Sequence, residues 1–448
     1  MPERAERSTP ALHLASLILI AALVLLALAA ALAPLLAPAQ DGTARRLAAA
    51  GIFTASYLAL AIGKVPGLSI DRAGIALVGA CLMVASGALT PEDAYRAIDL
   101  DTITLLLGMM IVVANLRLSG FFALATIWVA RRARRPLLLL GAIVAVSGVF
   151  SAFLVNDAIC LVLAPLVLEL TLTLKRRPLP YLLAVAMASN VGSTATITGN
   201  PQNMLIGSFS RIAYAQFTAT LAPVAAIGLL LTLGLIALTH RAEFTDPATL
   251  HAPTPRLHAN RALMLRALAA VAAVIVLFFA GQPPAKAAVI IGALLLLTRR
   301  VKSPRIYAEV DWSLLLMFAG LFIIVAGAEH QLLTPAIISQ VAALHLSSVP
   351  VLSVVTAALS NLVSNVPAVL MLHPFVGALP DQVKAWIVIA MASTLAGNFT
   401  VLGSIANLIV VDKAARRGVT ISFWDYFRVG APLTVLTIGI GAFWLGLR

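Results

Sequence analysis

Two polar, helix-breaking stretches interrupt apolar sequence and carry the residues best able to bind a solute. They are 188–207 (ASNVGSTATITGNPQNMLIG) and 392–408 (ASTLAGNFTVLGSIANL). Gly199 and Gly403 allow the backbone to unwind, and Pro201 removes a donor. Freed carbonyl and amide oxygens suit a hard cation such as sodium, whereas N–H groups that begin the next helix suit an anion or a polar solute. The candidate residues are Ser189, Asn190, Thr194, Thr196, Thr198, Gly199, Asn200, Gln202, Asn203, Ser393, Asn398, Thr400, Gly403, Ser404 and Asn407.

Two shorter polar breaks carry a second set of candidates. They read VND at 155–157 and SNV at 364–366, each between two apolar runs. An Asn amide in hydrocarbon needs partners, so Asn156 and Asn365 either satisfy broken backbone or contact a solute. We favour binding for both, because they occupy equivalent places in two halves of the chain. Ser364, beside Asn365, joins the candidates.

Asp157 is the only acidic residue in the four candidate segments, 151–165, 188–207, 360–374 and 392–408. A carboxylate at membrane depth is costly and marks a functional site by default. Burial favours its neutral form, which makes Asp157 a candidate proton carrier, or it could supply oxygen to a bound cation. The alternative is a structural Asp that accepts backbone N–H groups at the start of a helix.

The composition is that of a membrane protein. The 448 residues are 61% hydrophobic and 11% charged, whereas soluble domains carry about 25% charged residues. The net charge of +13 lies in short basic clusters between apolar runs, which is the positive-inside pattern and not a nucleic-acid surface. The two cysteines, Cys81 and Cys160, offer neither a disulfide framework nor zinc spacing. We expect a multi-pass protein of a bacterial-type inner (plasma) membrane, with the lipid bilayer and a small solute or ion as partners, no nucleic acid and no cofactor.

The apolar runs predict an all-α organisation. A run at 14–37 predicts an extra first span that is retained, although a cleaved signal is the alternative, and short runs at 121–130 and 332–344 predict interfacial helices. Runs on either side of each VND or SNV tip fit two spans or a re-entrant hairpin, and the absence of a loop at the tip favours the hairpin. The polar stretches break two helices. The two hairpins are predicted at 136–155 with 158–174 and at 349–364 with 366–379, and the broken helices at 179–206 and 385–411. Further spans are predicted at 47–63, 73–89, 102–116, 217–238, 262–280, 285–298, 312–328 and 429–447.

The order of elements recurs in the second half. With an offset of 204, the residues Met187, Ala188, Ser189, Thr196, Gly199 and Asn203 fall on Met391, Ala392, Ser393, Thr400, Gly403 and Asn407. The hairpin residues Ser151, Asn156 and Pro165 fall on Ser360, Asn365 and Pro374 with an offset of 209. Broken helices at matching places in two halves indicate a transporter binding site.

Charges predict opposite orientations for the halves. Basic clusters at 131–135 and 175–177 flank the first hairpin, whereas the second is flanked by acidic residues and Lys384. The fold class is therefore predicted as two inverted repeats, each with about five transmembrane helices, a re-entrant hairpin and a broken helix. The predicted divisions are an extra helix and loop (1–46), repeat 1 (47–239), a cytoplasmic inter-repeat loop (240–261) and inverted repeat 2 (262–448).

The four segments FLVNDAICLVLAP (153–165), SNVGSTATITGNPQN (189–203), LSNLVSNVPAVLMLHP (359–374) and STLAGNFTVLGSIANL (393–408) resemble the ion transporter superfamily. That superfamily includes arsenite permeases, sodium/proton antiporters, citrate transporters and divalent-anion/sodium symporters. The resemblance implies a scaffold, a mobile transport part of hairpins and broken helices, and a homodimer with elevator-like movement.

The resemblance also implies two half-sites. Asn156 would act with the loop from Thr196, and Asn365 with the loop from Thr400, each as a candidate sodium or substrate site. The Ser-Asn-Thr signature of the dicarboxylate branch is replaced at both tips. The Asn-Asp pair is more similar to the arsenite-permease branch.

We therefore expect a secondary active transporter, not an enzyme, that moves a small anion or an arsenite-like oxyacid coupled to protons or sodium. No Lys or Arg lies in the four segments, so a proton-coupled carrier of a weakly charged or neutral oxyacid fits best. The alternative is a sodium/proton antiporter in which Asp157 and the two loops bind only cations. A membrane enzyme or a passive channel is more remote, because no nucleophile–base or metal set is visible and a channel does not need two broken helices.

Overall fold

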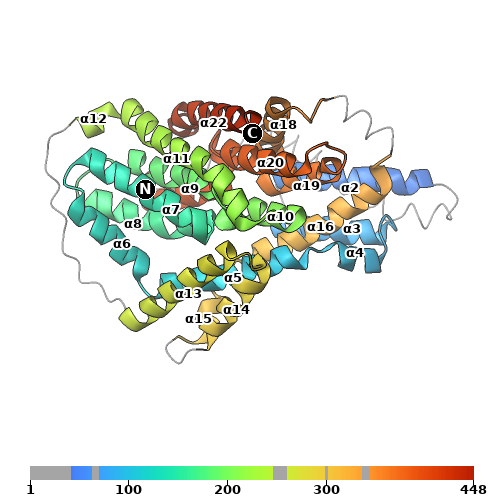
Figure 1. Ribbon diagram of the computed structural model, residues 1–448, viewed down its shortest axis with the longest axis horizontal. Helices are drawn as coiled ribbons and strands as arrows, with labels where there is room; N and C mark the ends of the chain where they lie inside the picture. Colours follow the sequence, from blue (N-terminus) through green and yellow to red (C-terminus); the bar gives the residue numbers. More distant parts are fainter. Residues whose placement is uncertain (1–41, 63–69, 246–259, 298–300, 335–343) are drawn as a thin grey trace, which may run out of the picture. The chain divides into compact units, whose positions relative to one another are not determined.

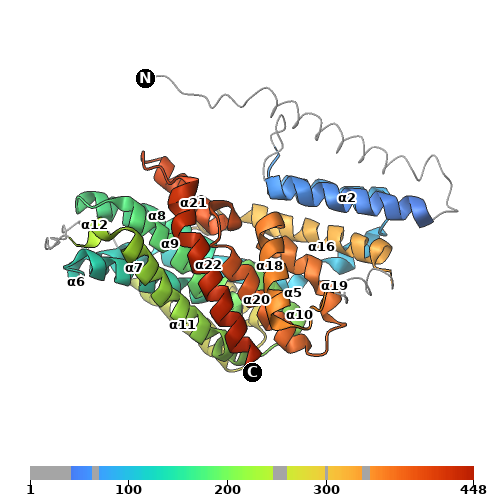
Figure 2. The same cartoon turned by 90° about the horizontal axis from the view of Figure 1, so that it is seen from above.

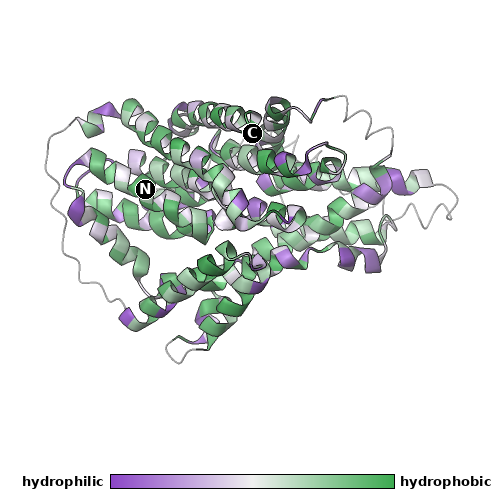
Figure 3. Ribbon diagram, viewed as in Figure 1, coloured by the Kyte–Doolittle hydropathy of each residue, from purple (hydrophilic) through white to green (hydrophobic). Residues whose placement is uncertain are grey.

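The fold was analysed in a computed structural model, which describes residues 42–62, 70–245, 260–297, 301–334 and 344–448. All regular elements in these ranges are helices, and seven are long and apolar enough to cross a membrane. The chain is therefore an all-α, multi-pass membrane protein, as predicted. In Figure 3 the long helices are coloured mainly for hydrophobic residues, with hydrophilic residues concentrated near several helix ends. The predicted span 14–37, most of the interfacial run 332–344 and most of the loop 240–261 lie outside the described residues.

The chain forms two compact units, and each takes segments from both halves of the sequence. The smaller unit, 1–99 with 312–343, contains α2 (Gly42–Ile62), α3 (Arg72–Ala85), α4 (Pro91–Ala97) and α16 (Trp312–Leu332). Gly320 of α16 lies against the backbone of Ala76, and an added Cβ would approach the Ala76 carbonyl carbon to 2.6 Å. Such close approach of small residues is how helices associate in a bilayer.

The larger unit, 100–311 with 344–448, contains every candidate binding residue. Its helices before the inter-repeat loop are α5 (Leu100–Leu118), α6 (Phe121–Arg132), α7 (Pro136–Leu154), α8 (Asn156–Thr173), α9 (Pro178–Ser193), η1 (Ile197–Gly199), α10 (Pro201–Ser210), α11 (Tyr214–Thr239) and α12 (Arg241–Phe244). The later ones are α13 (Arg261–Phe279), α14 (Pro284–Leu296), α15 (Ser303–Tyr307), α18 (Val349–Val363), α19 (Asn365–Val376), α20 (Gln382–Ala396), η2 (Val401–Gly403), α21 (Ile405–Ala415) and α22 (Phe423–Gly446). The predicted repeats, 47–239 and 262–448, cut across the two units.

Two helix pairs form hairpins at the predicted polar tips. Because α7 and α8 are both among the seven helices long enough to cross a membrane, the re-entrant arrangement stays a prediction. Helices α7 and α8 are joined by the single residue Val155, and α18 and α19 by Ser364. Both joining residues have positive φ angles, 64° and 78°. One residue in this conformation reverses the chain without a loop, which explains the uninterrupted apolar sequence on each side of the tip.

Two interrupted helices form the centre of the larger unit. The first runs α9, η1, α10, and the second α20, η2, α21. The side chains of α9 are buried from Pro180 to Ser193, and those of α20 from Ala385 to Ala396. Helices α11 and α22, the spans that follow the two broken helices, pack against each other (Figures 1 and 2). The sequence of hairpin, broken helix and span thus occurs twice.

Candidate functional site

The two broken helices have the same local backbone at the interruption. Thr196 and Thr400 are extended, with φ and ψ of −138° and 162° against −134° and 165°. Each is followed by one turn of 3-10 helix, and a second extended residue, Asn200 or Ser404, caps the next helix with its side chain. Asn200 accepts from the backbone N–H of Asn203 at 2.8 Å. The positions match at an offset of 204, as the sequence alignment predicted.

Glycine is required at the end of each 3-10 turn because the chain folds back on itself there. A Cβ on Gly199 would overlap the carbonyl oxygen of Ser193. A Cβ on Gly403 would approach the carbonyl oxygen of Gly397 to 2.9 Å. The two clashing carbonyls are again related by the offset of 204.

One Asn amide closes each loop. The Nδ2 of Asn203 donates to the carbonyls of Ser193, at 3.1 Å, and Thr196, at 3.0 Å. The Nδ2 of Asn407 donates to the equivalent carbonyls, those of Gly397 at 2.7 Å and Thr400 at 3.2 Å. The carbonyls that unwinding frees are therefore partly satisfied by these amides. This leaves the Oδ1 atoms of the two Asn residues available to partners from elsewhere.

Those partners come from the opposite half, and the exchange is reciprocal. Asn190 of the first half donates to Oδ1 of Asn407 at 3.0 Å, while Thr394 of the second half donates to Oδ1 of Asn203 at 3.3 Å. Ser404 donates to Asn190 at 3.1 Å, and Asn200 donates to Thr394 at 3.1 Å. The offset of 204 converts the first contact of each pair into the second. Two surfaces related by a two-fold axis exchange contacts in this way.

The first hairpin tip joins this network through Asn190. The Nδ2 of Asn156 donates to Oδ1 of Asn190 at 3.0 Å. Ser189 hydrogen-bonds the hydroxyl of Ser151 at 2.7 Å and donates to the carbonyl of Asn156 at 3.2 Å. The hydroxyl of Thr196 donates to the carbonyl of Ala152 on α7. The tip is thus fastened to the first broken helix on several sides.

The second hairpin tip lies against the second broken helix. A Cβ on Gly397 would come within 3.3 Å of the Asn365 amide nitrogen. Asn361 on α18 donates to the carbonyl of Ala396 at 3.1 Å. Asn190, which contacts the first tip, also donates to Asn398 at 2.9 Å. Because Asn398 follows Gly397, the two tips are linked through the interruption of the second broken helix.

Each tip presents the same unpaired atoms. The Oδ1 atoms of Asn156 and Asn365 are buried and have no hydrogen-bond partner among the residues that the structure describes. Side chains cap neither α8 nor α19, which begin at these two residues. Each tip therefore combines a free acceptor with first-turn N–H donors of an uncapped helix. An unpaired buried polar group costs about 1–3 kcal/mol, so it calls for a ligand or another explanation.

The remaining candidates lie nearby but serve the local backbone. The hydroxyl of Thr194 donates to the carbonyl of Asn190, at 3.3 Å, and that of Ser393 to Ala390, at 3.4 Å. Ser364 forms the tip connection itself. Asp157 lies in the first turn of α8 and is half-buried beside Asn156.

Several side chains of the network were not identified as candidates, among them Ser151 and Ser193. Thr394 is the offset-204 equivalent of Asn190, and that relation is the signal that could have found it. Tyr214 of α11 hydrogen-bonds Thr198 at 2.8 Å, and Tyr426 of α22 donates to Asn398 at 3.4 Å. Each tyrosine stands in the first turn of the span that follows a broken helix, and nothing in its sequence context marked it.

The site contains neutral oxygen and nitrogen donors and only one carboxylate. Among the described residues, no three His, Cys, Asp or Glu side chains group together as ligands for a metal ion. The unpaired amide oxygens and the loop carbonyls are the ligand type that a hard cation such as sodium accepts. The same atoms also accept hydrogen bonds from a hydroxylated solute.

Comparison with known proteins identifies the family. The citrate transporter family, CitMHS, matches residues 57–396. The chain belongs to this family. It is therefore a membrane transporter and not an enzyme, and the predicted relationship to the ion transporter superfamily is confirmed.

Relatives and a solved structure agree with this family. The uncharacterized transporter Rv2684 of Mycobacterium tuberculosis is 32% identical over 89% of this chain and 97% of its own length. The silicon efflux transporter LSI3 of rice (Oryza sativa subsp. japonica) is 29% identical over 84% of this chain and 93% of its own length. The crystal structure of the YdaH transporter of Alcanivorax borkumensis shares the fold, with a TM-score of 0.56 and 16% identity over 80% of this chain and 86% of that chain.

Proposed function

We propose that this transporter is a proton-coupled secondary carrier of a small, neutral, hydroxyl-bearing oxyacid. The observation that carries the proposal is the pair of hairpin tips. Asn156 and Asn365 each offer an unpaired, buried amide oxygen at the start of an uncapped helix. An undissociated hydroxyl group fits both features, because it donates to the amide oxygen and accepts from a first-turn N–H.

The lack of positive charge argues against a multiply charged anion as the solute. The four candidate segments contain no Lys or Arg. Lone pairs on the tip oxygens would repel a carboxylate, and each helix N-terminus contributes no more than about 2 kcal/mol even in a favourable, partly buried geometry. A citrate-like trianion would therefore need bound cations to offset its charge. A neutral oxyacid needs none.

Asp157 supplies the proposed link to the proton gradient. It is the only acid in the four segments and adjoins Asn156 in the first turn of α8. Protonation of its carboxylate would replace a charge beside the tip with a hydroxyl donor. Binding of solute at the tip and of a proton at Asp157 would then be coupled through adjacent residues.

The name of one relative supports the class of solute. LSI3 is a silicon efflux transporter, and silicon in neutral water is chiefly an uncharged acid that carries only hydroxyl groups. An arsenite-like solute has the same chemistry. We therefore place silicic and arsenous acids first among the solutes to be tested.

The test measures solute flux and charge movement in proteoliposomes under imposed pH or sodium gradients. Silicic acid, arsenite, citrate, succinate and sulfate are added separately. We expect flux of a neutral oxyacid that follows the pH gradient, with Asn156→Ala and Asn365→Ala lowering it at least tenfold. Asn115→Ala is the matched control, because Asn115 on α5 is also buried with an unpaired Oδ1 but lies outside the four segments. Asp157→Asn should abolish the dependence on pH.

A sodium/proton antiporter is the second candidate, because the two unpaired amide oxygens suit sodium as well. In that case sodium-for-proton exchange would proceed with no added solute. Exchange of this kind, with no oxyacid flux, would overturn the proposal. Sodium-driven flux of citrate would overturn it too.

A further inference from the structure

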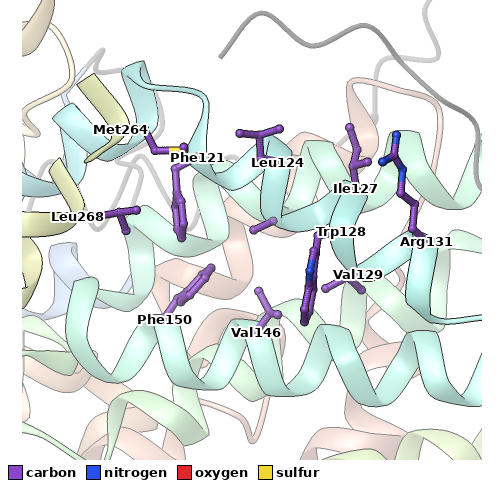
Figure 4. A pocket seen from close by; sticks show the side chains of 11 residues that line it. Phe121, Leu124, Ile127, Trp128, Val129, Arg131, Val146, Phe150, Met264 and Leu268 are labelled. Carbon is purple, nitrogen blue, oxygen red and sulfur yellow. The ribbon is translucent and has the colours of Figure 1, made fainter. Parts of the chain in front are cut away.

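A large apolar trough shares no lining residue with the proposed solute site. It has a volume of about 710 Å³ and is lined by residues of α6, α7 and α13. Phe121 and Phe150 face each other across one end, with ring centroids 5.5 Å apart, and Trp128 and Arg131 lie toward the other (Figure 4). Among the described residues of its lining, Arg131 alone is charged. This volume is far larger than an inorganic oxyacid needs and lies within the range of about 300–1,000 Å³ found for organic ligands.

Unpaired positive charge is concentrated at the Arg131 end. Arg131, Arg132, Arg134 and Arg135 are exposed, and none of the four pairs with an acidic side chain in the described ranges. The guanidinium of Arg132 lies 4.1 Å from the Trp128 ring centroid, which holds it near the trough. Trp128 is itself 59% exposed, as is common for tryptophan at the level of lipid headgroups.

We propose that the trough binds one anionic phospholipid, with an acyl chain between α6, α7 and α13 and the phosphate on Arg131 and Arg132. An apolar trough that ends in exposed arginines beside an exposed tryptophan matches the two parts of such a lipid. Clusters of arginine beside membrane helices attract anionic lipids, and each basic residue contributes about fivefold in affinity. The site is independent of the solute that the protein carries.

The test is native mass spectrometry of the full-length protein released from bilayers of equal parts phosphatidylcholine and phosphatidylglycerol. We expect wild type to retain phosphatidylglycerol in preference to phosphatidylcholine. Arg131→Gln with Arg132→Gln should weaken retention about 25-fold, from about fivefold for each arginine. Ala125→Trp, which fills the trough, should abolish it. Arg416→Gln with Arg417→Gln is the control, because it removes the same charge from the exposed end of α21 and should leave retention unchanged.

Other results would overturn the proposal. Equal retention of the two lipids would show that no headgroup site exists, and equal loss in the control would show a general effect of charge. If a second copy of the protein filled the trough in place of a lipid, Leu124→Cys would form disulfide-linked dimers. In that case Ala125→Trp would leave the retention of phosphatidylglycerol unchanged. Arg131 and Arg132 are exposed, so the variant that replaces both should fold. It therefore tests the proposal even if the Ala125→Trp protein fails to fold.

Discussion

Asn190 connects the two halves of the chain through both ends of one amide. Its nitrogen donates to Asn398 and Asn407, and its oxygen accepts from Asn156 and Ser404. Thr394 holds the equivalent place with a single hydroxyl, which accepts from Asn200 and Gln202 and donates to Asn203. At the residue scale, therefore, the site is set by side chains that satisfy several partners at once.

Removal of the Thr394 hydroxyl should destabilise the protein more than removal of an equally buried hydroxyl elsewhere. Thr394→Val removes the hydroxyl that pairs with Nε2 of Gln202 and Oδ1 of Asn203, while Asn200 keeps its contacts to Ser193. We therefore expect a loss of about 2 kcal/mol in the free energy of unfolding. The control is Thr171→Val, because the hydroxyl of Thr171 is also buried but bonds only to carbonyls of its own helix. Thermal unfolding in detergent compares the two, and equal midpoints would contradict a structural role for the network.

At the scale of elements, each broken helix depends on a glycine that allows the chain to pass close to itself. Gly199→Ala should disrupt η1, since its Cβ would overlap the Ser193 carbonyl. We expect a loss of more than about 2 kcal/mol in stability, as for other overpacked core positions. Gly234→Ala in α11 is the control: nothing lies within 4 Å of its Cβ position, so the gain in helix propensity should raise stability by up to about 1 kcal/mol. The unfolding midpoints should move in opposite directions.

The start of the first broken helix is fixed by a buried ion pair. Arg176, just before α9, pairs with Glu243 of α12 at 2.7 Å, and the hydroxyl of Tyr181 also donates to Glu243 at 3.1 Å. The side chains of Arg176 and Glu243 are only 9% and 7% exposed. Removal of one member of such a pair leaves the charge of the other buried without its countercharge.

Glu243→Gln should therefore cost about 3–5 kcal/mol. Asp412→Asn, which breaks the exposed pair with Arg416 on α21, should cost no more than about 0.5 kcal/mol. Unfolding midpoints of the two variants give the comparison. Comparable midpoints would show that Arg176 finds another partner or that water reaches the pair.

Much of this element-scale structure could be predicted from sequence. The hairpins and broken helices follow from polar tips and Gly-Pro breaks within apolar runs, and observed bounds differ from the predicted ones by a few residues. The conformation of Val155 and Ser364 could not be predicted, because neither residue type favours a positive φ. Tyr214 and Tyr426 could not be assigned to the site, since their contacts depend on how α11 and α22 pack.

At the scale of the molecule, the two halves are predicted to have opposite orientations in the membrane. The reciprocal contacts at the site are those expected of a two-fold relation, but direction across the bilayer is a separate property. The charges that flank each half predicted it. The offsets in the sequence thus predicted which elements pair, and the flanking charges predicted opposite orientations for them.

Labelling of single cysteines tests that orientation. In a background with Cys81→Ser and Cys160→Ala, a membrane-impermeant maleimide applied to intact cells should label Arg211→Cys and Lys384→Cys. Arg177→Cys and Arg416→Cys should react only after permeabilisation. The first broken helix would then run outward and the second inward. Labelling that gives both helices the same direction would contradict the inverted repeat. A position is assigned to one side when the labelling expected for that side exceeds the other at least threefold.

The reciprocal contacts also impose an order on biosynthesis. Asn190 and Asn203 leave the ribosome about two hundred residues before Thr394 and Asn407, a separation that the offset of 204 fixes. Until the second broken helix is inserted, the first has polar groups in the bilayer whose final partners do not yet exist. The first half can therefore insert early but completes its own hydrogen bonding only when the C-terminal part of the chain arrives.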